Sequence, residues 1–242
     1  MAESVVMLHG FAGTARAFDG VIAALHPERY SPLALNLLGH GSASRGPITF
    51  EDCVERVLAV SPPRFALCGY SLGGRIAQQL ALAAPERIER LVLVSTSPGI
   101  EDEQARRERI ESDEQLAREL EQSPFERFIE RWRSQPLFAA DPPEVRELAS
   151  ADHRRNDPLA LASAMRGLST GRMAPLWERL PQLALPVMLL AGERDTKYVA
   201  IAQRMAALLP DAELRILAGG HSLLLESPRA VADAIAAAPV SS

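Results

Sequence analysis

One serine between two glycines constrains the fold of this chain more than any other feature. In CGYSLGGR, at residues 68–75, Ser71 stands between Gly69 and Gly73. The apolar run RFALC comes directly before this pattern, and LGGRIAQQLALAA, which has helical spacing, comes directly after it. Glycines permit a sharp turn from a strand into a helix, so we expect this turn to present Ser71 above the edge of a sheet.

Short apolar runs alternate with segments of helical spacing along most of the chain. The runs that predict strands are SVVML, PLALNL, RFALCG, RIERLVLVST, LPVMLLAG and ELRIL. One of the predicted helices begins at Thr49, with Asp52 three residues later as in a capping box. This alternation is typical of an α/β fold in which helices cover both faces of a parallel sheet.

Residues 99–175 break the alternation. Charges crowd together in EDEQARRERIESDEQLARELEQ, and no strand-like run appears in this long stretch. We therefore predict a helical lid, inserted into a core that is formed by residues 1–98 and 176–242. Most of the charges in the lid are expected to form a solvated helix surface.

Composition excludes several classes of function. With a net charge of −5, 47% hydrophobic and 24% charged residues, the chain has no excess of lysine and arginine to neutralise nucleic-acid phosphates. Cys53 and Cys68 lie in apolar runs, as buried thiols do, which fits a reducing cytoplasm. The N-terminal MAESVVMLHGF has neither a basic segment nor a long apolar one, so we expect a cytoplasmic protein without membrane insertion.

A serine hydroxyl needs a base and an orienting carboxylate before it can react. Asp195 follows the strand LPVMLLAG and His221 follows ELRIL, each at the carboxyl end of its strand, where doubly wound sheets gather their sites. We therefore predict a catalytic triad of Ser71, Asp195 and His221. Glu193 is the competing acid, because it lies two residues nearer the strand, and His221 could instead be an ordinary loop histidine.

Negative charge that develops during such a reaction needs backbone donors. The N–H of Leu72, at the start of a helix, is one candidate for this oxyanion hole, and the N–H of Phe11, just past the first strand, is the other. His9 and His40 also lie near strand ends. His40 is predicted to shape a turn, and neither histidine is assigned to proton transfer.

The motifs LHGF, LLGHG, GYSLGG, GERD and GGH occur in this order across nearly the full length. With them the chain resembles the α/β-hydrolase superfamily, which implies the α/β-hydrolase fold and a Ser-His-Asp triad. The chain starts directly at the strand before LHGF, without the antiparallel pair that begins many members. We therefore expect a mostly parallel, doubly wound sheet of about six strands.

Further segments resemble one branch of that superfamily, the 2-succinyl-6-hydroxy-2,4-cyclohexadiene-1-carboxylate synthases of menaquinone and phylloquinone biosynthesis. They are GYSLGGR, STSPGIEDEQARRERIESD, FIERWRSQPLF, HRRNDPLALASAMRGLSTG and GERDTKY. The resemblance implies a carbon–oxygen lyase that eliminates pyruvate from 2-succinyl-5-enolpyruvyl-6-hydroxy-3-cyclohexene-1-carboxylate. It implies a small polycarboxylate substrate and no metal or organic cofactor, and we expect a monomer or a weak homo-oligomer.

The resemblance also implies a set of substrate-binding residues, since guanidinium groups pair with carboxylates through two parallel hydrogen bonds. They are Tyr70, Arg75, Arg109, Trp132 and Arg154. Arg155 is nearly as good a candidate as Arg154, because one residue of register separates them. Each arginine could instead be an exposed helix charge, and Trp132 could simply anchor the core of the lid.

Two other functions compete with this one. A lidded carboxylesterase or C–C bond hydrolase would use Ser71 on a neutral substrate, and would lose little when Arg75 or Arg109 becomes alanine. A non-catalytic ligand-binding module would keep its biological activity after Ser71→Ala.

Overall fold

The strands form a six-stranded sheet in the order β2-β1-β3-β4-β5-β6, and all neighbouring strands are parallel. The computed structural model describes residues 2–41 and 48–238. The strands are β1 (Glu3–Leu8), β2 (Tyr30–Leu35), β3 (Phe65–Tyr70), β4 (Ile88–Val94), β5 (Val187–Gly192) and β6 (Ala212–Leu217). The predicted α/β fold with about six mostly parallel strands is confirmed, and each strand coincides with one of the apolar runs.

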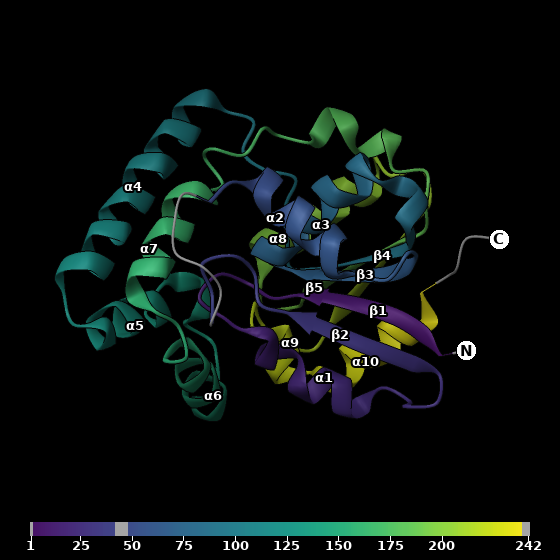
Figure 1. Ribbon diagram of the computed structural model, residues 1–242, viewed down its shortest axis with the longest axis horizontal. Helices are drawn as coiled ribbons and strands as arrows, with labels where there is room; N and C mark the ends of the chain where they lie inside the picture. Colours follow the sequence, from purple (N-terminus) through teal and green to yellow (C-terminus); the bar gives the residue numbers. More distant parts are fainter. Residues whose placement is uncertain (1, 42–47, 239–242) are drawn as a thin grey trace.

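Helices cover both faces of the sheet (Figure 1). One face carries α2 (Phe50–Val60), α3 (Leu72–Ala83) and α8 (Thr196–Ala206), and the other carries α1 (Asp19–Ala24), α9 (Leu223–Glu226) and α10 (Pro228–Ala237). Successive strand residues point to opposite faces, so Val6 and Leu8 join the first core and Val5 and Met7 the second. Burial on both faces explains why the strands are nearly continuous apolar runs.

The sequence predicts the N-cap of helix α2 correctly but not the start of helix α8. Helix α2 begins as expected, because the Thr49 side chain accepts a hydrogen bond from the Asp52 backbone N–H while the Asp52 side chain accepts one from the Thr49 N–H. Helical spacing predicts a helix from about Val199 to Leu208, but α8 begins at Thr196, since the Asp195 side chain accepts a hydrogen bond from the backbone N–H of Tyr198. The short helix α9 was not predicted.

The segment that was predicted to be a lid contains four α-helices within residues 99–175, which we call the insertion. They are α4 (Glu103–Gln122), α5 (Phe125–Arg133), α6 (Pro143–His153) and α7 (Pro158–Gly167). The helices pack to one side of the sheet, at its carboxyl end (Figure 1). They enclose a small apolar core of their own, built around Phe128, Trp132, Phe138, Leu161 and Met165. The predicted core also includes residue 1, residues 42–47 and residues 239–242, which lie outside the described part of the chain.

Both cysteines are buried and reduced. Burial raises the pKa of the Cys53 and Cys68 thiols to about 12, so neither forms an appreciable amount of thiolate near neutral pH. They behave as small apolar side chains. Among the helices of the described chain, none has the length and apolar character needed to cross a bilayer.

Candidate active site

Ser71 lies at the sharp turn between β3 and α3, in a backbone conformation that non-glycine residues rarely adopt. Its φ is 50° and its ψ is −108°. Hydrogen bonds hold this strained residue on both sides: its N–H donates to the Val94 carbonyl at 2.9 Å, and its carbonyl accepts from the Thr96 hydroxyl at 2.7 Å. The turn therefore presents the Ser71 side chain at the carboxyl end of the sheet.

The glycines on either side of Ser71 allow segments of backbone to approach closely. A Cβ atom added to Gly69 would lie 2.5 Å from the Gly73 carbonyl oxygen, and one added to Gly73 would lie 2.0 Å from the Leu8 carbonyl oxygen. Both contacts are with backbone atoms, so a side-chain rotation cannot relieve them. The G-x-S-x-G pattern is thus a requirement for packing β3 and α3 against the end of β1.

The three residues predicted as a triad lie within hydrogen-bond distance of one another. His221 Nε2 is 3.2 Å from Ser71 Oγ, and His221 Nδ1 is 2.6 Å from Asp195 Oδ2. A carboxylate can only accept, so Nδ1 carries the imidazole proton and Nε2 is left to accept from the serine hydroxyl. This is the arrangement in which a histidine can take a proton from a serine.

The structure distinguishes between the two candidate acids. Asp195 and His221 are buried, whereas the Glu193 side chain is exposed and lies 3.8 Å from Arg194. Asp195 follows a turn after β5, in which its N–H donates to the Gly192 carbonyl, and this turn directs its side chain toward His221. Of the two, only Asp195 is placed to orient the histidine.

The predicted oxyanion donors are available. Within residues 2–41 and 48–238, the backbone N–H groups of Phe11 and Leu72 donate to no protein acceptor. Leu72 is the first residue of α3, where N–H groups lack helical partners. The neighbouring N–H of Gly73 donates to the His9 carbonyl at 3.0 Å, which holds the first turn of α3 against the loop that contains Phe11.

Arg75 is a buried cation one helical turn after Ser71. Its residue is only 6% exposed, and across the described residues it has no ion-pair partner and its Nε has no hydrogen-bond acceptor. Burial lowers the pKa of Arg75, and a hydrogen bond with the Tyr198 side chain opposes this. A guanidinium without a carboxylate partner is costly to bury.

Arg109 and Trp132 reach the same cavity from the insertion. Arg109 is half-exposed and its Nε donates to both carboxylate oxygens of Asp113, at 2.9 and 2.8 Å. Trp132 packs in the core of the insertion and also lines the cavity next to Phe11, with 5.0 Å between the ring centroids.

In the described structure, Arg154 lies outside the wall of the Ser71 cavity. It caps α6 and forms two hydrogen bonds with Glu126, both 2.9 Å long, on the exposed surface of the insertion. The helix turns Arg155 in another direction, into the wall of a second cavity. The prediction for Arg154 therefore differs from its observed position, because the rotation of α6 was not evident from the sequence.

A cavity of about 90 Å³ contains Ser71 and His221 in its wall. Its other lining residues include four of the predicted binding residues, Tyr70, Arg75, Arg109 and Trp132. Sequence reasoning did not single out Tyr198 and Phe138, whose rings lie 4.7 and 5.8 Å from that of His221. Its spacing from Asp195 could have identified Tyr198, since a residue three positions after the N-cap lies in the first turn of α8.

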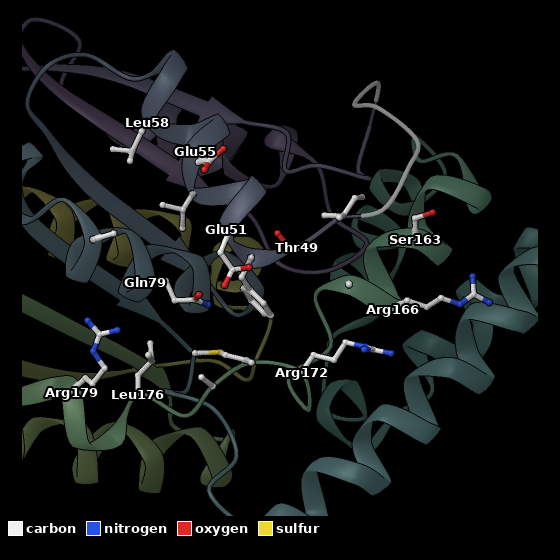
Figure 2. Close-up of a pocket in the computed structure, with 17 residues that line it drawn as sticks. Thr49, Glu51, Glu55, Leu58, Gln79, Ser163, Arg166, Arg172, Leu176 and Arg179 are labelled. Carbon is white, nitrogen blue, oxygen red and sulfur yellow. The ribbon is translucent and has the colours of Figure 1, made fainter.

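A larger cavity lies elsewhere. It has a volume of about 1080 Å³ and is formed by α2, α3, the end of α7 and the segment that follows (Figure 2). Figure 2 shows Glu51 and Gln79 on one side of it, while Arg166 extends toward α4, where it pairs with Glu114 and Glu121. The described residues of its wall include no member of the triad. Size alone therefore does not identify the catalytic cavity.

Three buried histidines make the stability of the protein depend on pH. Burial lowers the pKa of His9 to about 4, and lowers the pKa of His40 and His153 to about 3. Below pH 6.5 the unfolded chain binds protons at these sites and the folded chain does not. These sites therefore do not lower the free energy of unfolding above pH 6.5, and they lower it progressively as the pH falls from 6.5 toward 3.

We predict that the free energy of unfolding decreases by about 4 kcal/mol per pH unit between pH 6 and pH 5, since each of three histidines contributes about 1.4 kcal/mol. Urea unfolding at several pH values measures this slope. His40→Asn should reduce the slope by about one third, and substitution of the exposed His26 should leave it unchanged. A flat profile from pH 6.5 to 5 would contradict the prediction.

Comparisons with known proteins agree with this geometry. The model of the alpha/beta hydrolase family matches residues 5–234. A curated protein of Bacillus subtilis (strain 168), putative 2-succinyl-6-hydroxy-2,4-cyclohexadiene-1-carboxylate synthase, is 33% identical over 241 residues, which cover 94% of this chain and 87% of the relative. The 2-succinyl-6-hydroxy-2,4-cyclohexadiene-1-carboxylate synthase of Salmonella agona (strain SL483) is 34% identical, with coverage of 97% and 93%.

Solved structures give the same result. The structure of MenH from S. aureus superimposes with a TM-score of 0.90 at 31% identity and covers 97% of this chain and 92% of that one. An enol-lactonase from Burkholderia xenovorans LB400, at 21% identity and a TM-score of 0.81, shares the fold.

Proposed function

The chain belongs to the alpha/beta hydrolase family, and from that premise we propose that it eliminates pyruvate from 2-succinyl-5-enolpyruvyl-6-hydroxy-3-cyclohexene-1-carboxylate. The product would be 2-succinyl-6-hydroxy-2,4-cyclohexadiene-1-carboxylate. The relatives from B. subtilis and Salmonella carry the name of this synthase. The observation that carries the proposal is Arg75: a buried guanidinium, without an ion-pair partner among the described residues, in the same cavity as Ser71.

In the proposed reaction, Ser71 acts as a base and is not acylated. His221, oriented by Asp195, accepts the hydroxyl proton while Ser71 Oγ removes a proton from a ring carbon of the substrate. The electron pair of the broken C–H bond forms a new ring double bond, the existing ring double bond shifts by one position, and the C–O bond to the enolpyruvyl group breaks, with its electron pair staying on the oxygen. The proton that was removed ends on the terminal carbon of that group, which leaves as pyruvate.

The remaining residues bind and position the substrate in this proposal. Arg75 holds one carboxylate in the buried cavity, where the low dielectric strengthens the interaction, and Arg109 offers the guanidinium donors that Asp113 leaves free. The N–H groups of Phe11 and Leu72 stabilise negative charge that develops on the substrate oxygen. We infer that this chemistry needs neither a metal nor an organic cofactor.

The synthase is distinguished from a carboxylesterase by the effect of Arg75→Ala. We predict that kcat/KM for pyruvate release falls about 100-fold, because charge-assisted hydrogen bonds to a carboxylate are lost. A coupled assay of pyruvate release from the enzymatically prepared substrate measures this effect, with p-nitrophenyl acetate hydrolysis measured in parallel.

The matched control is Arg107→Ala, on the exposed side of α4, where Arg107 pairs with Glu103; it should retain the wild-type rate. If the wild type released no pyruvate but cleaved the ester in a way that depends on Ser71 and not on Arg75, the protein would be a lidded carboxylesterase. The proposed reaction would then be wrong.

A further inference from the structure

A second cavity adjoins the one that contains Ser71. It has a volume of about 400 Å³ and is lined by residues of the segment 16–20, of α6 and of α9; we call it the side cavity. Gly10, Tyr70 and Phe138 line both cavities. The cavity at Ser71 measures about 90 Å³, whereas ligand pockets usually measure about 300–1,000 Å³. The two cavities together reach the usual volume of a ligand pocket, and the rings of Tyr70 and Phe138 lie in the wall that the cavities share.

The side cavity contains buried polar atoms that lack a partner. Arg133 and His153 line it and are 9% and 6% exposed. Neither Arg133 Nε nor His153 Nδ1 forms a hydrogen bond with any described residue. Buried polar groups are usually paired, so unpaired ones in a cavity wall favour a ligand with polar atoms there.

Arg133 is held in a fixed position. Its Nη2 donates to Asp141, whose carboxylate also accepts from the Ser222 hydroxyl at 2.7 Å, next to His221. The guanidinium carbon lies 4.4 Å from the centroid of the Phe138 ring. The Phe138 ring in turn lies 5.8 Å from that of His221, so Phe138 lies next to both the Arg133 guanidinium and the His221 imidazole.

The other charged groups in the wall form pairs of opposite charge. Arg155 lies 3.8 Å from Asp152, which is too far for a hydrogen bond, while Asp152 accepts from both the N–H and the hydroxyl of Thr14. The remaining pair is Arg16 with Asp19, 3.2 Å apart. The arginine donor that lacks an acceptor among the described residues is therefore Arg133 Nε, although Nη2 of the same side chain pairs with Asp141.

We infer that the side cavity receives the pyruvate that the reaction releases, with Arg133 binding its carboxylate and His153 donating to its ketone oxygen. The inference rests on the proposed function, because only that reaction forms pyruvate. When the C–O bond breaks, its electron pair stays on the oxygen, which becomes the ketone oxygen once the terminal carbon has taken the proton. Desolvation lowers the pKa of His153 to about 3, and Arg133 adds to this, so the neutral imidazole can donate from Nδ1.

Direct binding of pyruvate to the full chain tests this inference, measured by saturation-transfer NMR with titration. Arg133→Gln should weaken pyruvate binding about tenfold or more, and His153→Phe should weaken it several-fold. Arg127→Gln, on the exposed side of the same helix, is the matched control and should bind as the wild type does. Pyruvamide, which lacks the carboxylate, should not bind. Pyruvate binding that is equal in the wild type, Arg133→Gln and His153→Phe would overturn the inference.

Two further measurements keep the result decisive. If Arg133→Gln does not fold, a magnetisation transfer from the Leu224 methyl groups, which line the side cavity and not the one at Ser71, to the pyruvate methyl group in the wild type supports the side cavity, and its absence overturns it. If Arg75→Ala abolishes pyruvate binding while Arg133→Gln preserves it, pyruvate binds at Ser71 instead. Pyruvate release from the full substrate is measured separately. A wild type that binds added pyruvate through Arg133 but releases no pyruvate from the substrate would contradict the proposed function alone.

Discussion

Replacing Ser71 by alanine should lower kcat for pyruvate release by about three orders of magnitude or more. The substitution removes the group that accepts the substrate proton, and general-base catalysis typically contributes about 10²–10⁴-fold, with larger losses when members of a triad act as a unit. KM should change little, since Arg75 and the other binding groups are untouched. The coupled pyruvate assay measures both constants, and the melting temperature confirms that the variant is folded.

A matched serine supplies the control for this experiment. Ser163 lies on α7 and donates to the Leu159 carbonyl at 3.3 Å, away from the cavity at Ser71. Ser163→Ala should retain the wild-type rate. If Ser71→Ala kept more than about a tenth of the wild-type kcat, Ser71 would not be the base, and the role proposed for the triad would have to be abandoned.

Replacing Gly73 by alanine should prevent the protein from reaching its native fold or destabilise it by about 3 kcal/mol or more. The added Cβ would lie 2.0 Å from the Leu8 carbonyl oxygen and 2.7 Å from that of His9. Both are backbone atoms at the end of β1, a central strand, so relief requires moving the strand or α3. For a domain of this size we expect the melting temperature to fall by about 10 °C, together with loss of activity.

Gly20→Ala is the control for the glycine experiment. A Cβ there meets only the Pro228 side chain, at 3.1 and 3.4 Å, and a small shift of the proline ring relieves the contact. Because alanine also favours helix α1, we expect a change of less than about 1 kcal/mol. Thermal unfolding of the two variants compares the effects, and a Gly73→Ala protein that melts with the wild type would show that the close approach is not required.

The order of strands and helices could be predicted from the sequence because burial on both faces of the sheet leaves a simple pattern. Each strand is a short apolar run, and each core helix has apolar residues at helical spacing. Helix starts were less predictable. The Asp195 side chain caps α8 and sets its start at Thr196, and a sequence pattern does not show that one carboxylate serves both as a cap and as a partner of His221.

The candidate triad could be predicted because its residues follow strands. Parallel strands end at the same edge of the sheet, so Ser71, Asp195 and His221 were expected to meet, and their side chains lie within hydrogen-bond distance. Which of Asp195 and Glu193 lies beside His221 depends on a turn after β5 that the sequence leaves open.

The sequence by itself determined the parallel sheet, the sharp turn at Ser71 and the chain order of the candidate triad, because glycine sterics and strand periodicity are local. Only the tertiary structure decided which charged side chains of the insertion face a cavity. The rotation of a helix about its axis depends on how its apolar face packs. That packing places Arg154 on the surface beside Glu126 and buries Arg133 beside Phe138. Helical spacing alone does not distinguish two such arginines, since each is surrounded in the sequence by similar charges.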